Sequence, residues 1–277
     1  MIDPADPAQL ETLLKKNHIE LKHSLGQNFL VDPDVRDRVA EAAGVTKNDE
    51  VLEVGAGVGT LTVALAPRSK RLVAVEIDRR LIRTLRSVVG ENSHVQVVEA
   101  DILKYDVRAA FPSGGEIVAG NIPYNLTGAL IRKLLDVPSR PKRLSLVVQK
   151  EVAERWTAAT GASLSTVAVQ VFAVAHIGFT IPAIAFTPEP RVDSALVTLD
   201  VRDKPAVDVP DMDAFFRLVE SVFQFRRKQL GNALGMMSGL GSTAAGQRLR
   251  GLGIAPERRA QTLSLLEWEA VYKAFSE

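Results

Sequence analysis

The sequence predicts an α/β fold, in which a mostly parallel, doubly wound sheet with an antiparallel edge precedes a small C-terminal all-α domain. Two observations lead to this prediction. Short β-rich runs alternate with helical patterns through the first two thirds of the 277 residues, and this alternation is typical of parallel sheets with helices on both faces. Helical periodicity then continues from a segment rich in proline and aspartate to the last residues.

The composition is that of an ordinary globular protein. Apolar residues make up 46% of the chain and charged residues 24%, which suits one large domain and a small one. The formal net charge of +1 leaves nucleic acid possible as a partner without requiring it, because whole-chain charge says little about a local basic face. The chain has no cysteine, so we expect no disulfide, no thiolate metal site and no cysteine nucleophile.

The N-terminal residues show no targeting pattern. Residues 1–16 are acidic before they are basic and lack an apolar core of signal-peptide length. No apolar run reaches the length of a transmembrane helix. We therefore expect a cytoplasmic protein with no membrane contact and no metal, and we take a monomer as the default.

Five runs are predicted as the parallel strands. They are "EVLEVG" (50–55), "RLVAVE" (71–76), "VQVVEAD" (95–101), "EIVAGN" (116–121) and "RLSLVVQ" (143–149). Helices are predicted after the first, second and fourth of them, in "TLTVALA", "RRLIRTLRSVV" and "LTGALIRKLLD". In the second helix, Leu81, Ile82, Leu85, Val88 and Val89 recur at helical spacing.

Two further apolar runs are predicted to complete the sheet. "STVAVQVFAVA" (165–175) and "SALVTLDV" (194–201) have no convincing helix between them, only the proline-rich "FTPEPRVD", so we expect a strand pair at an antiparallel edge. The segment "RDKPAVDVPDMD" reads as a linker. We therefore assign residues 1–203 to the large domain, with 1–24 as an N-terminal extension, and residues 204–277 to the helical domain.

Ligands of doubly wound folds bind outside the carboxyl ends of the strands, where this chain carries informative residues. The first strand is followed by Gly55-Ala56-Gly57-Val58-Gly59, the second ends in Glu76, and the third is followed by Asp101. Glycines permit positive φ and close backbone approach, and an acid at the position of Glu76 suits ribose hydroxyls. A glycine loop alone also makes a simple tight turn, but the three features together favour a nucleotide-like ligand.

The loop does not follow the dinucleotide pattern, which needs glycine where this chain has Thr60. Its E-x-G-x-G-x-G spacing is similar to the first motif of S-adenosylmethionine (SAM) methyltransferases. The large domain is therefore expected to be a Rossmann-like SAM-dependent methyltransferase domain.

The hexapeptide "GNIPYN" (120–125) follows the fourth strand. Out of context it reads as a polar turn, but beside the glycine loop it is similar to the (Asn/Asp)-Pro-Pro-Tyr motif of methyltransferases that act on exocyclic amines. The lone pair of an adenine amine is delocalised into the ring, so acceptors that pull its N–H groups out of conjugation expose it to a sulfonium methyl. Candidate acceptors are the Asn121 side-chain oxygen and a carbonyl held by Pro123, and Tyr124 offers a stacking face.

The ordered motifs resemble those of the ribosomal RNA adenine dimethyltransferases, the KsgA family, over nearly the whole chain. The matching segments are "LGQNFLVD", "LEVGAGVGTLT", "VEID", "AD", "GNIPYN", "VVQKEVAER", "FTPEPRVDSALV", "FQFRRKQLGNAL" and "PERRAQTLSLLEWEAV". The resemblance implies transfer of methyl groups from SAM to two adjacent adenines near the 3′ end of 16S ribosomal RNA, in the small ribosomal subunit precursor.

The resemblance also implies residue roles. The cofactor would be bound by Gln27, Asn28 and Leu30, which close over it, by Gly55 and Gly57 at its methionine part, by Glu76 at its ribose, and by Ile77, Asp101 and Ile102 at its adenine. Asn121 would lie between cofactor and target base and bind the cofactor as well, with Phe186 stacking on that base opposite Tyr124. Without the resemblance, residues 27–35 read as a loop and helix cap made by Asp32 or Asp34, and Phe186 reads as a core aromatic.

Basic residues of the helical domain are candidate RNA contacts. They are Arg226, Arg227, Lys228, Arg258 and Arg259. A solvated helix face is the alternative, because acids are nearly as frequent in that domain. One segment departs from the family: "TAATGASLST" (157–166) lacks the Tyr-Gly pair that commonly precedes Leu-Ser, which leaves the role of this loop open.

Two other functions remain as alternatives. Erm-type enzymes methylate one adenine of large-subunit ribosomal RNA, but "FQFRRKQLGNAL" as a helix and "PERRAQTLSLLEW" as a tail fit the KsgA family better. A non-catalytic RNA-binding assembly factor is the second alternative, and the intact Glu76, Asp101 and "NIPY" argue against it. A small-molecule methyltransferase would leave the helical domain without a purpose.

Overall fold

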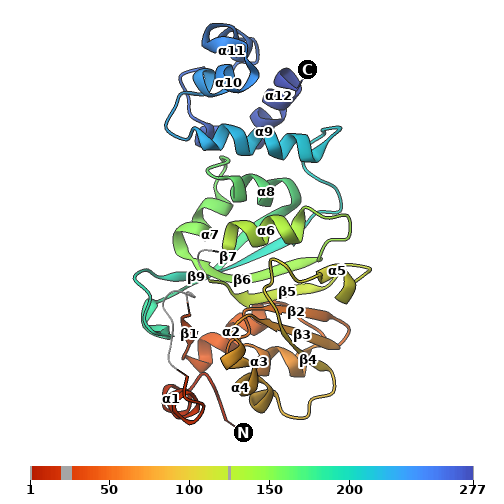
Figure 1. Ribbon diagram of the computed structural model, residues 1–277, viewed down its shortest axis with the longest axis vertical. Helices are drawn as coiled ribbons and strands as arrows, with labels where there is room; N and C mark the ends of the chain where they lie inside the picture. Colours follow the sequence, from red (N-terminus) through yellow and green to blue (C-terminus); the bar gives the residue numbers. More distant parts are fainter. Residues whose placement is uncertain (1, 20–26, 124–125, 277) are drawn as a thin grey trace. The chain divides into compact units, whose positions relative to one another are not determined.

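The computed structural model describes residues 2–19, 27–123 and 126–276 (Figure 1). The chain divides into two compact units. Unit 1 comprises Met1–Glu154 and Val174–Val201, and unit 2 comprises Arg155–Ala173 and Arg202–Glu277. The sequence placed the boundary at residues 203 and 204, close to the second crossing. It did not separate residues 155–173, which group with the C-terminal helices although they come earlier in the chain.

Unit 1 contains a seven-stranded sheet within the described residues, in the order β4-β3-β2-β5-β6-β9-β7. Its strands are β2 (Glu50–Val54), β3 (Arg71–Glu76), β4 (Val95–Glu99), β5 (Ile117–Asn121), β6 (Arg143–Gln149), β7 (Ala173–Ile181) and β9 (Ser194–Val201). The strands from β4 to β6 pair in parallel and β9 pairs antiparallel to β6. The predicted fold class, a parallel doubly wound sheet with an antiparallel edge, is therefore confirmed.

Helices cover both faces of this sheet. In Figure 1, α2 (Pro33–Ala42), α3 (Thr62–Leu65) and α4 (Arg79–Val89) lie on one side of the strands, and α6 (Thr127–Leu135) lies on the other. Unit 1 also contains α1 (Pro7–Lys16), α5 (Val107–Ala110) and the start of α7 (Lys150–Thr157). From β2 the chain continues to β3 and β4 on one side, and from the neighbouring strand β5 it continues to β6 on the other, so the loops after β2 and β5 lie at a topological switch point.

The helix caps and stripes follow from the sequence. Asp32 is the N-cap of α2, and its side chain accepts the N–H of Val35 at 3.0 Å, which decides between the two candidate aspartates. In α4, the expected stripe buries Leu81, Ile82, Leu85 and Val88, whereas Val89 is only half-buried.

The strand predicted for residues 165–175 is wrong. These residues form most of α8 (Leu164–Phe172), which Ser163 caps by accepting the N–H of Thr166 at 3.2 Å, and β7 begins only at Ala173. Most side chains of this helix are buried, and a continuous apolar run does not distinguish a buried helix from a buried strand.

Unit 2 is helical in its described residues. Besides α8 it contains α9 (Met212–Gln224), α10 (Leu230–Ser238), α11 (Gly241–Gly251) and α12 (Leu265–Phe275). Aromatic rings form its core, where Phe172 stacks on Phe216 and Phe223 packs against Trp268. The segment "FQFRRKQLGNAL", read as one helix, is instead split by a turn between α9 and α10. No helix in the described part of the chain is long and apolar enough to cross a membrane.

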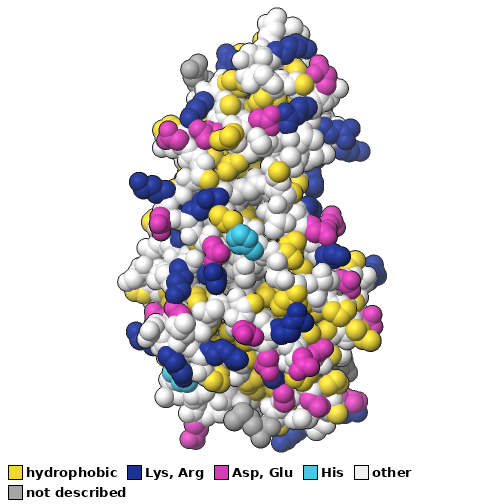
Figure 2. Space-filling model, turned by 180° about the vertical axis from the view of Figure 1, so that it is seen from behind, with side chains coloured by type: hydrophobic (Ala, Val, Ile, Leu, Met, Phe, Trp, Pro, Cys, Tyr) yellow, Lys and Arg dark blue, Asp and Glu magenta, His cyan; other side chains and the backbone are white. Residues whose placement is uncertain are grey.

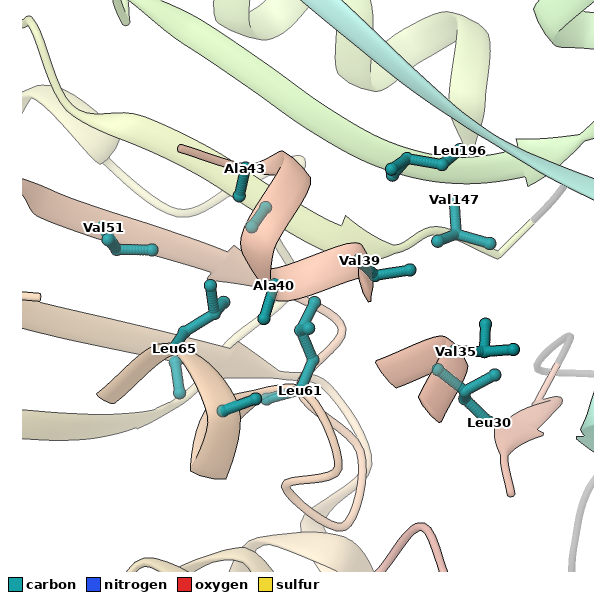
Figure 3. Close-up of a cluster of buried hydrophobic side chains, with 14 of the residues drawn as sticks. Leu30, Val35, Val39, Ala40, Ala43, Val51, Leu61, Leu65, Val147 and Leu196 are labelled. Carbon is teal, nitrogen blue, oxygen red and sulfur yellow. The ribbon is translucent and has the colours of Figure 1, made fainter. Parts of the chain in front are cut away.

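A hydrophobic cluster joins α2 to strands of the sheet in unit 1. Figure 3 shows Val39 and Ala40 of α2 and its C-cap residue Ala43 between the strand residues Val51 and Val147 and the side chains of Leu61 and Leu65. Leu30 and Val35 belong to the same cluster. The segment that contains Leu30 is thereby tied to the core of the sheet.

Candidate active site

A pocket lies at the carboxyl ends of β2, β3, β4 and β5 in unit 1. Its wall contains eleven of the predicted site residues: Gln27, Asn28, Leu30, Gly55, Gly57, Glu76, Ile77, Asp101, Ile102, Asn121 and Pro123. Residues far apart in the sequence thus meet where doubly wound folds bind ligands. Tyr124, predicted as a stacking residue, lies outside the described residues.

The glycine loop after β2 has the backbone shape that the sequence predicts. Gly55 and Gly57 have φ values of +70° and +59°, in the left-handed region. A Cβ on Gly57 would stand 3.0 Å from Cε1 of Phe29, so the ring packs directly on the loop backbone. Glycine is required here both by the backbone conformation and by the neighbouring ring.

Glu76 closes the loop onto the end of β3. Its Oε2 accepts the N–H of Gly57 and its Oε1 accepts the N–H of Asp78, both at 2.8 Å. Burial raises the pKa of Glu76, while these backbone N–H groups act in the opposite direction. A carboxylate has about four acceptor sites, so Glu76 can still accept from a hydroxyl group of a ligand.

The next strand end supplies a second acid between two apolar side chains. Oδ1 of Asp101 accepts the N–H of Leu103 at 3.0 Å, which orients the carboxylate in the turn after β4. Ile102 is buried, whereas Ile77 is 55% exposed although it is large and apolar. An exposed isoleucine in the wall of a pocket is suited to cover a flat ring.

Asn121 ends β5 with a defined amide orientation. Its Nδ2 donates to the backbone carbonyl oxygen of Asn28 at 2.8 Å. Because a carbonyl only accepts hydrogen bonds, this contact requires the nitrogen and leaves Oδ1 turned away from Asn28. The amide oxygen is therefore the atom of Asn121 that is available as an acceptor.

The strand β5 approaches β2 closely just before Asn121. A Cβ on Gly120 would lie only 2.4 Å from the carbonyl oxygen of Val54. Glycine at this position thus permits the close contact that places Asn121 next to the glycine loop.

Phe186 is not brought to the pocket with the other predicted residues. It is 3% exposed and belongs to the hydrophobic cluster of Leu30 and Val35. It lies in β8 (Phe186–Thr187), which pairs antiparallel with β1 (Phe29–Leu30). The Phe186 side chain is thus buried and absent from the described pocket lining, although its backbone pairs with Leu30 of that lining.

The sequence interpretation missed one acid in the pocket wall and a second acid that contacts a residue of this wall. Glu53 lies in the pocket wall and is 1% exposed, and its Oε2 has no hydrogen-bond partner among the described residues. Burial raises the pKa of Glu53 to about 8. The sequence feature that could have identified Glu53 is the position of a charged residue inside the apolar run of β2. The second acid is Asp78, whose carboxylate accepts from Nε2 of Gln27 at 2.8 Å.

The five basic candidates of unit 2 differ in their surroundings. Arg226, Arg227 and Lys228 lie in the turn between α9 and α10, and Arg259 follows Arg258 in the chain. Arg258 forms an ion pair with Glu267, which raises the pKa of Arg258 and lowers that of Glu267. Much of the Arg258 charge is therefore balanced within unit 2.

Known proteins resemble this chain in sequence and in fold. The family model described as Ribosomal RNA adenine dimethylase matches residues 18–277. A protein named Ribosomal RNA small subunit methyltransferase A from Shouchella clausii is 38% identical, covering 96% of this chain and 93% of its own. One of the same name from Pelotomaculum thermopropionicum is also 38% identical, covering 99% and 98%.

Solved structures agree with these relatives. A dimethyladenosine transferase from Plasmodium falciparum has a TM-score of 0.71 at 26% identity, covering 88% of this chain and 96% of its own. The 23S rRNA methyltransferase ErmE has a TM-score of 0.67 at 26% identity, covering 90% and 100%. The resemblance inferred from the motifs is thus confirmed, and the chain belongs to the ribosomal RNA adenine dimethylase family.

Proposed function

We propose that the chain transfers methyl groups from SAM to the N6 amines of two adjacent adenines in the 3′-terminal hairpin loop of 16S ribosomal RNA, giving N6,N6-dimethyladenine during ribosome biogenesis. The observation that carries this proposal is the Asn121 amide, held at the edge of the pocket with its oxygen turned away from Asn28. An amide oxygen in this position suits an amine that must be oriented.

The pocket residues fit SAM by their chemistry. The Glu76 carboxylate suits the two ribose hydroxyls, and the Asp101 carboxylate suits the adenine amine, with Ile77 and Ile102 against the ring. The buried Glu53 Oε2, which lacks a partner among the described residues, suits the amino group of the methionine part. Bound SAM supplies a methyl group on a sulfonium centre.

The protein's contribution to transfer would be orientation and electrostatics. An acceptor at Oδ1 of Asn121 holds one N–H of the adenine amine and localises its lone pair toward the methyl group. The backbone around Pro123 holds a carbonyl as a second acceptor. The proton leaves after the methyl group is transferred, so no strong general base is needed.

The proposed RNA substrate is supported by the family and by the physical properties of RNA loops. A base in a hairpin loop can be splayed out and bound by stacking. Arg226 and Arg227, in the turn between α9 and α10, suit phosphate contacts. On the face shown in Figure 2, Lys and Arg side chains are interspersed with Asp and Glu, so contacts would depend on local groups. We expect the protein to act as a cytoplasmic monomer on the small subunit precursor.

An Erm-type activity on large-subunit RNA is the alternative, favoured by the similarity to ErmE. The curated relatives at 38% identity are instead named for the small subunit. A non-catalytic assembly factor is the third possibility, and the intact pocket argues against it.

Methyl transfer from labelled SAM tests these functions directly. Small and large ribosomal subunits lacking adenine methylation would be offered separately, and the modified nucleoside identified by mass spectrometry. Dimethyladenine on the small subunit supports the proposal, and modification of the large subunit alone supports the Erm-type activity. SAM binding without transfer to either subunit would contradict both.

A further inference from the structure

The segment 27–30 is held at the pocket from two sides. On one side β1 pairs with β8, and the N–H of Val31 donates to the carbonyl oxygen of Ala185 at 2.8 Å. On the other side, Nε2 of Gln27 donates to Oδ2 of Asp78 at 2.8 Å. Asp78 is buried but is absent from the described pocket lining, so contact with a ligand does not explain this bond.

Asp78 is itself firmly held. Nε and Nη2 of Arg80 donate to its two oxygens at 2.9 and 2.5 Å, and the N–H of Arg80 makes the N-cap bond at 3.1 Å. The guanidinium of Arg80 is the main reason why the pKa of Asp78 lies below its ordinary value. Asp78 is therefore an ionised, fixed acceptor, and charged hydrogen bonds are the stronger ones.

The hydrogen bonds of Asp78 connect it to Glu76 and, through Gln27, to the segment that contacts Asn121. The N–H of Asp78 donates to Oε1 of Glu76 at 2.8 Å. Through Gln27, its carboxylate holds the residue next to Asn28, whose carbonyl oxygen orients the Asn121 amide at 2.8 Å. Loss of the bond between Asp78 and Gln27 would remove one of the contacts that hold the Asn28 carbonyl, which decides which way the Asn121 amide points.

We propose that Asp78 is a positioning residue for methyl transfer. By binding Gln27 it fixes residues 27–30 over the pocket, so that the Asn28 carbonyl keeps the Asn121 oxygen directed to the target amine. The inference rests on the proposed function for the role of Asn121, while the bond between Asp78 and Gln27 affects SAM binding as well.

Four variants separate positioning from stability. Asp78→Ser keeps a good N-cap for α4 but removes the second oxygen that accepts from Gln27. Gln27→Ala removes the other partner, and the double variant tests their coupling. Asp106→Ser is the matched control, because Asp106 caps α5 by accepting the N–H of Ala109 at 3.0 Å and is absent from the described pocket lining. The measurements are kcat and KM for SAM, the Kd of SAM by calorimetry, and Tm.

We expect Asp78→Ser to lower kcat about 10-fold and to weaken SAM binding by a similar factor, with little change in Tm. The double variant should be no worse than Gln27→Ala alone, because both changes break one interaction. Asp106→Ser should leave kcat and Kd unchanged. Normal kcat and Kd in Asp78→Ser, losses that multiply in the double variant, or an equal loss in Asp106→Ser would each overturn the proposal.

The two proposals fail in different ways. If the unmodified protein transfers no methyl group to either subunit, the proposed function fails. In that case the SAM Kd values of the four variants still test the coupling between Asp78 and Gln27. A loss of SAM affinity that is shared by Asp78→Ser and Gln27→Ala supports the positioning role. Independent losses of SAM affinity contradict it.

Discussion

At the scale of single residues, the proposed chemistry depends most directly on the Asn121 amide. Its oxygen has one task in the proposal, to accept from the target amine, and it makes no part of the cofactor's ribose or adenine contacts. We expect Asn121→Ala to lower kcat about 10²- to 10³-fold, the range for loss of one preorganised polar group. Single-turnover transfer to small subunits measures this effect.

Two further variants test whether the effect of Asn121→Ala comes from the loss of the acceptor oxygen. Glu76→Ala should weaken SAM binding first, because its carboxylate also holds the glycine loop through the N–H of Gly57. Asn121→Asp keeps an acceptor oxygen but places a second oxygen against the carbonyl of Asn28, so it should not restore activity. Near-normal turnover of Asn121→Ala would refute the acceptor role.

Glu53 makes stability depend on pH in a defined direction. Its pKa rises from 4.5 to about 8 on folding, chiefly through burial. Between these values the unfolded chain has lost a proton that the folded protein keeps, so the free energy of unfolding falls as pH rises. Glu53→Gln resembles the protonated form, and we expect it to be more stable than the natural protein at pH 8, by a few kcal/mol, with little difference at pH 4.5.

Denaturant unfolding at several pH values tests the role of Glu53. Glu50→Gln is the matched control, because Glu50 lies in the same strand with a side chain that is 38% exposed. This control should not stabilise the protein at pH 8, because it removes no buried carboxylate. A stability difference for Glu53→Gln that stays constant over this range would contradict the prediction.

At the scale of elements, patterns of alternation and strand-end chemistry predicted most of unit 1. Local periodicity predicted the five parallel strands and α4. The repeated glycines after β2 predicted a loop with positive φ values. The strand predicted for residues 165–175 was wrong because a buried helix and a buried strand can have the same continuous apolar sequence. Asp78 was missed because its importance comes from Gln27, 51 residues away in the chain.

The loop after β2 gives a prediction about backbone shape. Gly57→Ala places a side chain at a φ of +59° and 3.0 Å from the Phe29 ring. The left-handed conformation alone costs about 1–2 kcal/mol for a non-glycine residue. We expect lower Tm and SAM binding that is weaker by about 10-fold or more, because Phe29 and the loop must move apart in the pocket wall.

Gly115→Ala is the control for this loop. Gly115 has a similar φ of +78°, but a Cβ there would meet nothing within 4 Å. It should therefore lose stability without losing SAM affinity. Equal losses of SAM affinity in the two variants would show that crowding against Phe29 is irrelevant.

At the scale of the whole molecule, the sites proposed for the cofactor and for RNA belong to different units. The net charge is only +1, so the long-range electrostatic attraction of RNA is weak. Individual contacts must therefore supply the affinity for RNA. The described lining residues of the pocket proposed for the cofactor lie in unit 1, whereas Arg226 and Arg227 lie in unit 2. The sequence grouped Arg258 with them because it cannot show that Glu267 balances this charge.

We therefore expect the double variant Arg226→Ala/Arg227→Ala to weaken RNA binding while leaving the SAM Kd unchanged. For each arginine that binds a phosphate, its removal should reduce the slope of log K against log salt by about 0.9 on duplex sites and about 0.7 on single strands. Filter binding of the rRNA hairpin across a salt series measures this slope. Arg217→Ala/Arg250→Ala removes the same charge from exposed residues that pair with Asp211 and Glu257. If this control weakens binding as much, unit 2 attracts RNA only through its net charge, and the turn between α9 and α10 makes no specific contact.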